Sequence, residues 1–216
     1  MNPNLLLLDL DNTLIDRDAA FRSAAAAFLA DNALPEADLG WLMALDASGY
    51  TPKPEVTRAL HERYAVPEAA VRELVDGGAA DRVVLSGTVR EALVAASADG
   101  WTCVVVTNGR TAQQERKLRR TGLDGLVRGW VISEAVGHAK PSPEIFHAAA
   151  TVGGRPLSGA WMVGDSAHAD IGGAHGLGLR NVWVSNGRAW EEPGFRPTWT
   201  EGDVVAAIGR VRASGR

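Results

Sequence analysis

The chain has 216 residues, of which 46% are hydrophobic and 22% charged, a composition typical of a folded globular protein rather than a disordered or collagen-like one. The formal net charge of −4 argues against a nucleic-acid partner, because binding to a phosphate backbone requires clustered lysine and arginine. The single cysteine, Cys103, excludes an intramolecular disulfide and a cysteine metal cluster.

The first apolar run, residues 5–8, is interrupted by Asp9 and is far shorter than a signal or membrane segment. The residues before it, Met1 to Asn4, contain no basic stretch. We therefore expect a cytoplasmic protein without a membrane partner, in keeping with the lone cysteine.

Short apolar runs alternate with helical stretches along the chain. The runs cover residues 5–8, 102–106, 129–132, 160–163 and 181–184. Runs of this length are typical of strands buried on both faces, and their alternation with helices predicts an α/β fold with a parallel sheet.

Residues 16–80 differ from this pattern, since they are mostly helical and contain no convincing apolar strand run. The α/β pattern resumes at Val83-Val84-Leu85. We interpret the segment as an insert, with a core of residues 1–15 and 84–216 and a helical subdomain of residues 16–83.

Local signals predict three helix starts in the core. Thr88 with Glu91 and Thr111 with Gln114 have capping-box spacing. In Ser142-Pro143, serine is a natural N-cap and proline a natural first helical residue.

Polar residues follow the predicted strands, at the sheet edge where open α/β sheets bind ligands. They are Asp9, Asp11 and Thr13 after the first run, Thr107, Asn108 and Gly109 after the second, Lys140 one loop after the third, and Asp165, Ser166 and Asp170 after the fourth. We expect these side chains to meet in one crevice.

This set contains four carboxylates and only one obvious cation, Lys140. The carboxylates are those of Asp9, Asp11, Asp165 and Asp170. Like charges packed so closely are unstable by themselves, and a divalent cation would relieve the repulsion. An all-oxygen site without cysteine or a histidine pair favours Mg²⁺ over zinc.

Four motifs in this order resemble those of the haloacid dehalogenase superfamily. They are Asp9-Leu10-Asp11-Asn12-Thr13-Leu14, Thr107-Asn108-Gly109, Lys140-Pro141 and Gly164-Asp165-Ser166-Ala167-His168-Ala169-Asp170. The resemblance implies a Rossmann-like three-layer core, with residues 16–83 as an inserted helical cap in the C1 position. It also implies a Mg²⁺-dependent phosphohydrolase that acts on a small phosphorylated metabolite through an aspartyl-phosphate on Asp9.

The same resemblance assigns roles to individual residues. Asp9 would attack phosphorus as an ionised carboxylate, and Asp11 would protonate the leaving oxygen and later deprotonate water. Thr107 and Lys140 would be catalytic and would also bind phosphate, with Lys140 holding Asp9 and the phosphoryl group together by charge. The remaining roles are phosphate binding by Asn108 and Gly109, metal binding by Asp9, Asp165 and the backbone carbonyl of Asp11, and support of these groups by Asp170 and Ser166.

Other functions stay open at this point. A haloacid dehalogenase is the nearest alternative, although such enzymes lack an aspartate at the position of Asp11. A phosphomutase is another, although Thr13 resembles the phosphatase form of the motif more closely. A non-catalytic ligand-binding module would be expected to have lost Asp9, Asp11 or Lys140, and all three are intact.

Substrate choice is the least determined property. The segment from Asp9 to Phe21 resembles the opening of nucleotidase-like and phosphoglycolate phosphatase-like members, so a nucleoside monophosphate or a sugar phosphate ranks among the substrates. Trp41, Tyr50 and Lys53 of the insert are pocket candidates, although packing is the simpler role for aromatic residues. The five histidines lack metal-ligand spacing.

We also expect the insert to open and close over the crevice, on hinges near residues 16–18 and 81–86. The sequence leaves the oligomeric state open.

Overall fold

The computed structural model of this chain describes residues 5–215, so the expectation drawn from Met1 to Asn4 lies outside the described residues. The chain divides into two compact units. One comprises Met1–Ile15 and Leu85–Arg216, and the other comprises Asp16–Val84.

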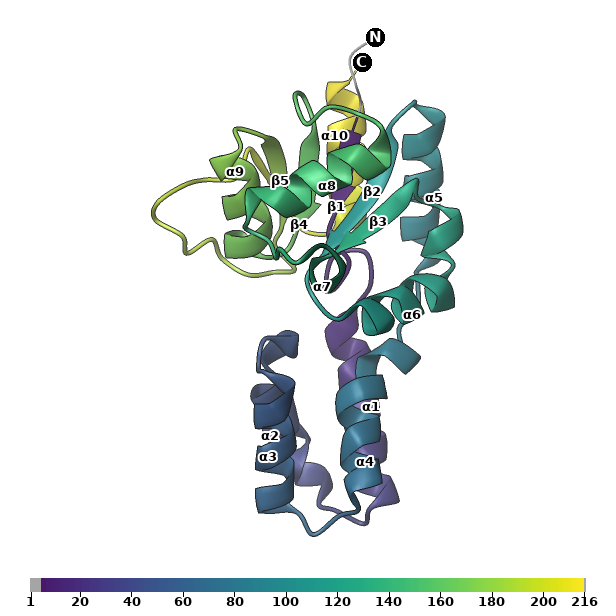
Figure 1. Cartoon of the computed structure of the whole chain (residues 1–216), viewed down its shortest axis with the longest axis vertical. Coiled ribbons are helices and arrows are strands. Elements are labelled where there is room, and N and C mark those ends of the chain that lie inside the picture. Colours follow the sequence, from purple (N-terminus) through teal and green to yellow (C-terminus); the bar gives the residue numbers. More distant parts are fainter. Residues whose placement is uncertain (1–4, 216) are drawn as a thin grey trace. The chain divides into compact units, whose positions relative to one another are not determined.

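The first unit is built on a six-stranded, fully parallel sheet with the strand order β3-β2-β1-β4-β5-β6 (Figure 1). The strands are β1 (Leu5–Leu8), β2 (Thr102–Thr107), β3 (Gly129–Ile132), β4 (Trp161–Gly164), β5 (Arg180–Val184) and β6 (Trp199–Glu201). The predicted α/β fold with a parallel sheet is confirmed. Strand β6 was not predicted from the sequence.

Helices cover both faces of this sheet. They are α5 (Gly87–Ala98), α6 (Thr111–Thr121), α7 (Ser133–Val136), α8 (Pro143–Gly153), α9 (Gly173–Gly176) and α10 (Val204–Ser214). Ile145 and Phe146 of α8 and Ala174 of α9 pack on one face, whereas α10 packs with α5 on the other (Figure 1). The core is therefore a three-layer sandwich.

Strand β1 lies in the interior of the sheet and is completely buried, since all four of its leucines have 0% exposure. Leu5 and Leu7 join the cluster beneath α8, and strand geometry directs Leu6 and Leu8 to the opposite face. Burial of each leucine side chain contributes about 1.5–3 kcal/mol, so the strand is firmly held. The residue that follows it, Asp9, is thereby fixed at the carboxyl edge of the sheet.

The helix starts show where the local predictions fail. Helix α5 is capped by Ser86, whose Oγ accepts from Val89 N at 3.2 Å, so the prediction of a capping box at Thr88 is wrong. Helix α6 does begin at Thr111, but the capping position belongs to Arg110 and the Gln114 side chain bonds elsewhere. Helix α8 begins at Pro143 with Ser142 at the N-cap, as predicted.

The second unit is helical. Its helices are α1 (Arg17–Asp31), α2 (Leu39–Asp46), α3 (Lys53–Arg63) and α4 (Glu68–Arg72), followed by a π-helical turn, Glu73–Gly77. The buried guanidinium of Arg17 donates to both carboxylate oxygens of Asp46, which ties the start of α1 to the end of α2. Asp16 caps α1 by accepting from Ala19 N at 2.8 Å.

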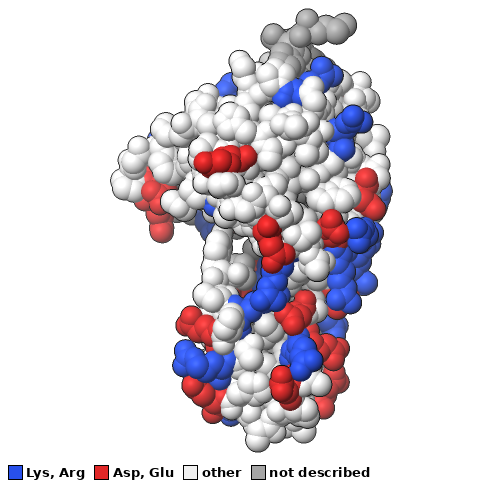
Figure 2. All heavy atoms as spheres, in the orientation of Figure 1, with Lys and Arg blue, Asp and Glu red and all other residues white. Residues whose placement is uncertain are grey.

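The surface drawn in Figure 2 carries acidic and basic side chains close to one another over much of its charged area. None of the helices in residues 5–215 has the length and apolarity that crossing a bilayer requires.

Candidate active site

Asp9 directly follows β1 and is only 7% exposed. Its backbone N–H donates to Val163 O of β4 at 2.9 Å, which continues the sheet by one residue and fixes the direction of the side chain. Thr13 Oγ1, from the turn after β1, donates to Asp9 Oδ2 at 3.2 Å. One oxygen of Asp9 is thus held by the first motif itself.

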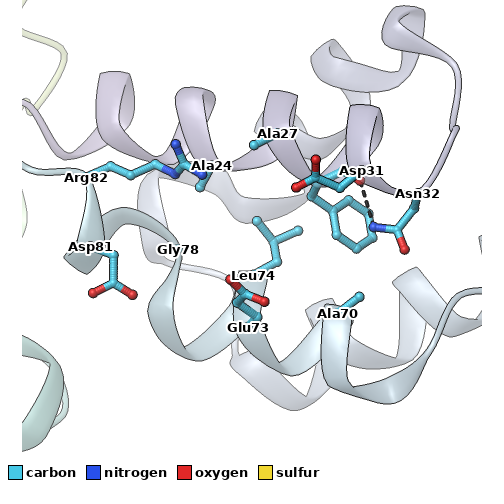
Figure 3. Close-up of a pocket in the computed structure, with 11 residues that line it drawn as sticks. Ala24, Ala27, Asp31, Asn32, Ala70, Glu73, Leu74, Gly78, Asp81 and Arg82 are labelled. Carbon is cyan, nitrogen blue, oxygen red and sulfur yellow. Dashed lines mark hydrogen bonds between the residues drawn. The ribbon is translucent and has the colours of Figure 1, made fainter.

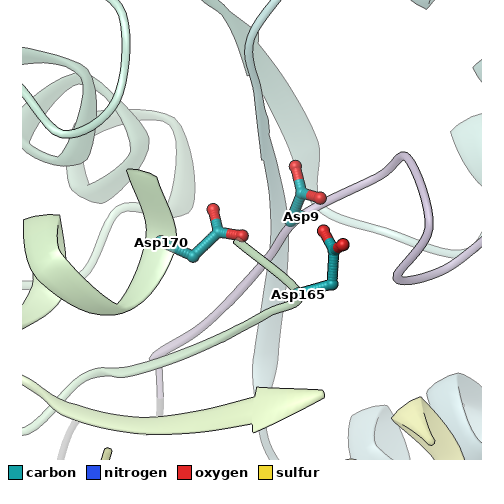
Figure 4. A group of neighbouring side chains, drawn as sticks. All are labelled: Asp9, Asp165 and Asp170. Atoms are coloured by element: carbon teal, nitrogen blue, oxygen red, sulfur yellow. The ribbon is translucent and has the colours of Figure 1, made fainter. Parts of the chain in front are cut away.

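Three carboxylates meet at this edge of the sheet. Asp9, Asp165 and Asp170 each offer a carboxylate oxygen, and these atoms lie within 4.8 Å of one another (Figure 4). Asp165 follows β4, and Asp170 lies in the π-helical turn Ala167–Gly172. The separation is compatible with a shared cation, because oxygens around Mg²⁺ at about 2.0–2.1 Å lie roughly 3–4 Å apart. The set therefore fits a hard divalent ion.

Lys140 is the cation of this cluster and is 5% exposed. Its Nζ lies 2.6 Å from Asp9 Oδ1, 2.7 Å from Asp170 Oδ1 and 2.6 Å from the Val106 carbonyl oxygen. The contacts with Asp9 and Val106 are hydrogen bonds, whereas the contact with Asp170 is an ion pair without hydrogen-bond geometry. Lys140 consequently balances charge and orients Asp9 before any substrate is present.

Arg188 is a second cation at the cluster and was not predicted from the sequence. Its Nη2 donates to Asp165 Oδ2 at 3.0 Å and to the Asp165 carbonyl oxygen at 2.8 Å. Trp183 Nε1 donates to the same carbonyl oxygen at 2.8 Å. The backbone and the carboxylate of Asp165 are therefore both fixed from β5 and the loop that follows it.

Negative charge and burial shift the protonation of this cluster. Burial raises the pKa of Asp9 to about 8, against the opposing charge of Lys140 and with the help of Asp170 and Asp165. Burial, with Asp170, raises the pKa of Asp165 to about 6, although Arg188 lowers it. Burial lowers the pKa of Lys140, but the Asp170 and Asp9 carboxylates together have a larger, opposite effect. The pKa of Lys140 is therefore raised above its usual value, and this amine stays charged. Without a metal, the cluster carries more carboxylates than its cations balance.

Gly164 leaves space for Asp170, which is fully buried and accepts from Ser166 N at 3.0 Å. A Cβ at position 164 would lie 2.2 Å from Asp170 Oδ2. We expect Gly164→Ala to displace this carboxylate and to lower the free energy of unfolding by about 1–3 kcal/mol, the range for overpacking. Urea unfolding measures the loss, with Gly176→Ala as the control because a Cβ at that position would have nothing within 4 Å. Equal midpoints for the two variants would contradict the expectation.

Thr107, Asn108 and Gly109 leave β2 beside the cluster. Asn108 is joined to the Lys140 loop by two bonds, since its Nδ2 donates to the Lys140 carbonyl oxygen at 2.9 Å and Lys140 N donates to its Oδ1 at 2.8 Å. Gly109 has φ +142°, and its N–H donates to Ser133 Oγ at 2.9 Å. Binding of phosphate by the Gly109 N–H would require this bond to open.

Asp11 is placed differently from the other acids. Its carboxylate receives Lys117 Nζ at 2.7 and 2.8 Å and Gln114 Nε2 at 2.9 Å, both from α6. The expectation of one cation for four carboxylates is therefore wrong, since Lys140, Lys117 and Arg188 all contact members of the set. The structure brings Asp9, Asp165, Asp170 and Lys140 into direct contact range, and it holds Asp11 against α6.

The remaining predicted support residue, Ser166, caps the π-helical turn, because its Oγ accepts from Ala169 N at 3.2 Å. Cys103 is buried within β2, and burial raises its pKa to about 12, so it is a core residue. Ser166 therefore supports the turn that carries Asp170, and Cys103 packs in the strand that leads to Thr107.

A separate pocket of about 220 Å³ lies within the helical unit (Figure 3). Phe28 and Leu74 provide apolar walls, while Asp31, Glu73 and Arg82 provide charged groups. Among the described residues, no member of the predicted site lines this pocket, and neither do Trp41, Tyr50 or Lys53. The residues that line it lie between Ala24 and Arg82, outside the four motifs.

Known proteins resemble this chain in sequence. Pyrimidine 5'-nucleotidase YjjG from Escherichia coli is 42% identical over 97 residues, which cover 44% of this chain and 43% of that protein. Phosphoserine phosphatase from Thermus thermophilus is 34% identical over 148 residues, or 68% of this chain and 59% of that protein. The matched part of the chain thus spans about half the length of these curated relatives.

A solved structure shares the fold across both units. YfnB from Bacillus subtilis, described as a HAD-hydrolase bound to magnesium, has a TM-score of 0.73 at 22% identity and covers 98% of this chain and 99% of that chain. The sequence also matches the family described as haloacid dehalogenase-like hydrolase over residues 3–178. Because this match takes in all four motifs and most of the sheet, the chain belongs to the haloacid dehalogenase-like hydrolase family.

Proposed function

We propose that the protein is a Mg²⁺-dependent phosphohydrolase that cleaves a small phosphate monoester through an aspartyl-phosphate on Asp9. The observation that carries this proposal is the position of Asp9, at the end of a buried strand, 2.6 Å from Lys140 Nζ and within 4.8 Å of the Asp165 carboxylate. A nucleophile with a fixed counter-charge and a site for a hard cation suits an anionic substrate. The names of the two curated relatives, a nucleotidase and a phosphatase, support the same class.

In the first step, an oxygen of Asp9 forms a bond to phosphorus while the bond from phosphorus to the leaving oxygen breaks. Asp11 enters this step protonated and donates that proton to the leaving oxygen, which departs as an alcohol and leaves Asp11 as a carboxylate. Thr107, at the end of β2, binds a phosphoryl oxygen in this proposal, with the Asn108 and Gly109 region beside it. Lys140 keeps Asp9 oriented, and in this proposal its positive charge also attracts a phosphoryl oxygen.

In the second step, Asp11 accepts a proton from water, whose oxygen attacks phosphorus. The bond from phosphorus to Asp9 breaks and inorganic phosphate leaves, so both aspartates return to their starting state. When bound to Asp9, Asp165 and the Asp11 carbonyl, Mg²⁺ supplies positive charge that offsets repulsion between the nucleophile and the substrate. Asp170 has its two oxygens on Lys140 and Ser166 N, which favours a role in holding Lys140.

The affinity for Mg²⁺ should fall as the pH falls. Because burial raises the pKa of Asp9 to about 8, the metal must displace a proton from this carboxylate at neutral pH. We expect the affinity to weaken by up to about tenfold for each unit of pH below that value. Calorimetric titration of metal-free protein with Mg²⁺ at pH 6, 7 and 8 measures this, and an affinity independent of pH would contradict it.

The helical unit, Asp16–Val84, serves as the cap in this proposal and sets the choice of substrate. The structure of YfnB is described as revealing interdomain movement, which supports hinges near residues 16–18 and 81–86 here. Spin labels on Arg58→Cys and Arg155→Cys report the distance between the two units. A distance distribution that is unchanged by a phosphate analogue would argue against a moving cap. A cytoplasmic location and the lack of a nucleic-acid partner stay predictions.

The proposed activity is tested by assaying metal-free protein, with and without added Mg²⁺, against a panel of phosphate monoesters and 2-haloacids. Nucleoside monophosphates, sugar phosphates and phosphoserine belong in the panel. We expect phosphate release that depends on Mg²⁺ and no halide release. Halide release without Mg²⁺ would replace the proposal with a dehalogenase, and phosphoryl transfer between sugar positions would replace it with a mutase.

A further inference from the structure

Lys117 is a buried lysine on a helix whose other basic residues are arginines. Only three of the 22 basic residues are lysines, namely Lys53, Lys117 and Lys140. Lys117 is 3% exposed, whereas Arg116, Arg119 and Arg120 on the same helix are exposed. An ammonium loses much of its hydration on burial and requires a compensating acceptor.

The acceptor is the carboxylate of Asp11. Lys117 Nζ lies 2.7 Å from one of its oxygens and 2.8 Å from the other, although the two residues are 106 positions apart. The ammonium therefore holds both ends of the carboxylate, which stops it from rotating about its last bond. The Asp11 side chain remains 24% exposed, so it is held in place without being enclosed.

Gln114 adds a second restraint from the same face of α6, three residues before Lys117. It is 1% exposed, and its Nε2 donates to Asp11 Oδ2 at 2.9 Å and to Thr107 Oγ1 at 2.7 Å. A single amide nitrogen thus joins Asp11 to the residue at the end of β2. Rotation or translation of α6 would move both groups together.

We propose that Lys117 and Gln114 are positioning residues that hold Asp11 at the angle from which it transfers protons. This inference rests on the proposed function, in which Asp11 is the acid and base. Proton transfer demands close and aligned approach, and small displacements lower rates by large factors. The sequence motifs assign no role to either residue.

The test uses the kinetics of Lys117→Met, which keeps the length of the side chain and removes its charge. Nitrophenyl phosphate has a good leaving group that departs without a proton, whereas an alkyl phosphate from the panel needs one. We expect Lys117→Met to lower kcat/KM for the alkyl ester by about 10–100-fold and for the aryl ester at least about tenfold less. Gln114→Met should show the same dependence on the leaving group, and exposed Arg120→Met should show none.

A double variant separates positioning from general damage. In an Asp11→Asn background, Lys117→Met should cause no further loss, because its effect acts through the carboxylate. Two results would overturn the proposal: an equal loss of kcat/KM for both esters, or a further loss when Lys117→Met is added to Asp11→Asn.

Unfolding provides a readout that does not depend on activity. We expect Lys117→Met and Asp11→Asn each to lower the urea midpoint. The midpoint of the double variant should be no lower than that of the less stable single variant. Additive losses would overturn the inference. Should the wild type hydrolyse none of the esters, the proposed function fails by itself, and the urea midpoints alone decide whether Lys117 holds Asp11.

Discussion

Asp9→Asn is expected to abolish hydrolysis of every phosphate ester that the wild-type protein accepts. A carboxamide has nearly the size of a carboxylate but lacks its negative charge and cannot form the acyl phosphate. We expect kcat to fall by at least about 10³-fold, since loss of a nucleophile removes the covalent route altogether. A steady-state assay with the best ester of the panel measures the loss.

The fold of this variant should survive. The amide oxygen can accept from Lys140 Nζ and the amide nitrogen can donate to Thr13 Oγ1, which replaces both side-chain contacts of Asp9. A matched control is Asp124→Asn, which removes an exposed carboxylate from the same unit and should leave kcat unchanged. Phosphate that hydroxylamine releases, as it does from an acyl phosphate, should be found on the wild-type protein after rapid quenching in acid and be missing from Asp9→Asn. Equal turnover by the two proteins would eliminate the mechanism.

Lys140→Met is expected to cost about 3–5 kcal/mol of unfolding free energy, the loss typical of a buried ion pair with one partner removed. It leaves Asp9 and Asp170 close together without the ammonium that lies 2.6 and 2.7 Å from their oxygens. Val106 O also loses a donor, so a buried carbonyl becomes unsatisfied. Urea unfolding in the presence of a chelator measures this loss.

The loss should be larger at pH 8 than at pH 5. Without the cation, the carboxyl groups of the folded variant have pKa values above those of the unfolded chain, so the folded form binds more protons between the two values. Stability therefore falls as the pH rises through that interval. Adding Asp170→Asn should restore part of it, because it removes one of the opposed charges. A loss independent of pH, or no recovery in the double variant, would contradict this account of Lys140.

The core of the fold could be predicted because five strands are continuous apolar runs. Strand β6 escaped prediction for a physical reason: Trp199–Glu201 has three residues, is partly exposed and exists through its pairing with β5. No local pattern marks such an edge strand. The capping prediction at Thr88 failed because Ser86 is the N-cap, two residues earlier, and its Oγ accepts from Val89 N.

The site could be predicted as far as the strand ends determine it. Asp9, Thr107 and Asp165 follow parallel strands, so the sheet alone brings them to one edge. Lys117 and Arg188 escaped because their contacts depend on the rotation of a helix and the course of a loop. A signal for Lys117 does exist in hindsight. Gln114, Lys117, Leu118 and Thr121 recur at helical spacing and are all buried, but this face is mostly polar and does not stand out as hydrophobic.

The reciprocal pair between Asn108 and the backbone of Lys140 has a consequence for genetics and for engineering. The two loops are 32 residues apart in the chain, but they should move together, because both the nitrogen and the oxygen of the Asn108 amide are bonded to the backbone of Lys140. A substitution at Asn108 would therefore also displace Lys140, whose ammonium holds Asp9. Its effect on activity would come from a misplaced nucleophile as well as from weaker phosphate binding. Compensating changes for such a variant are to be sought around position 140.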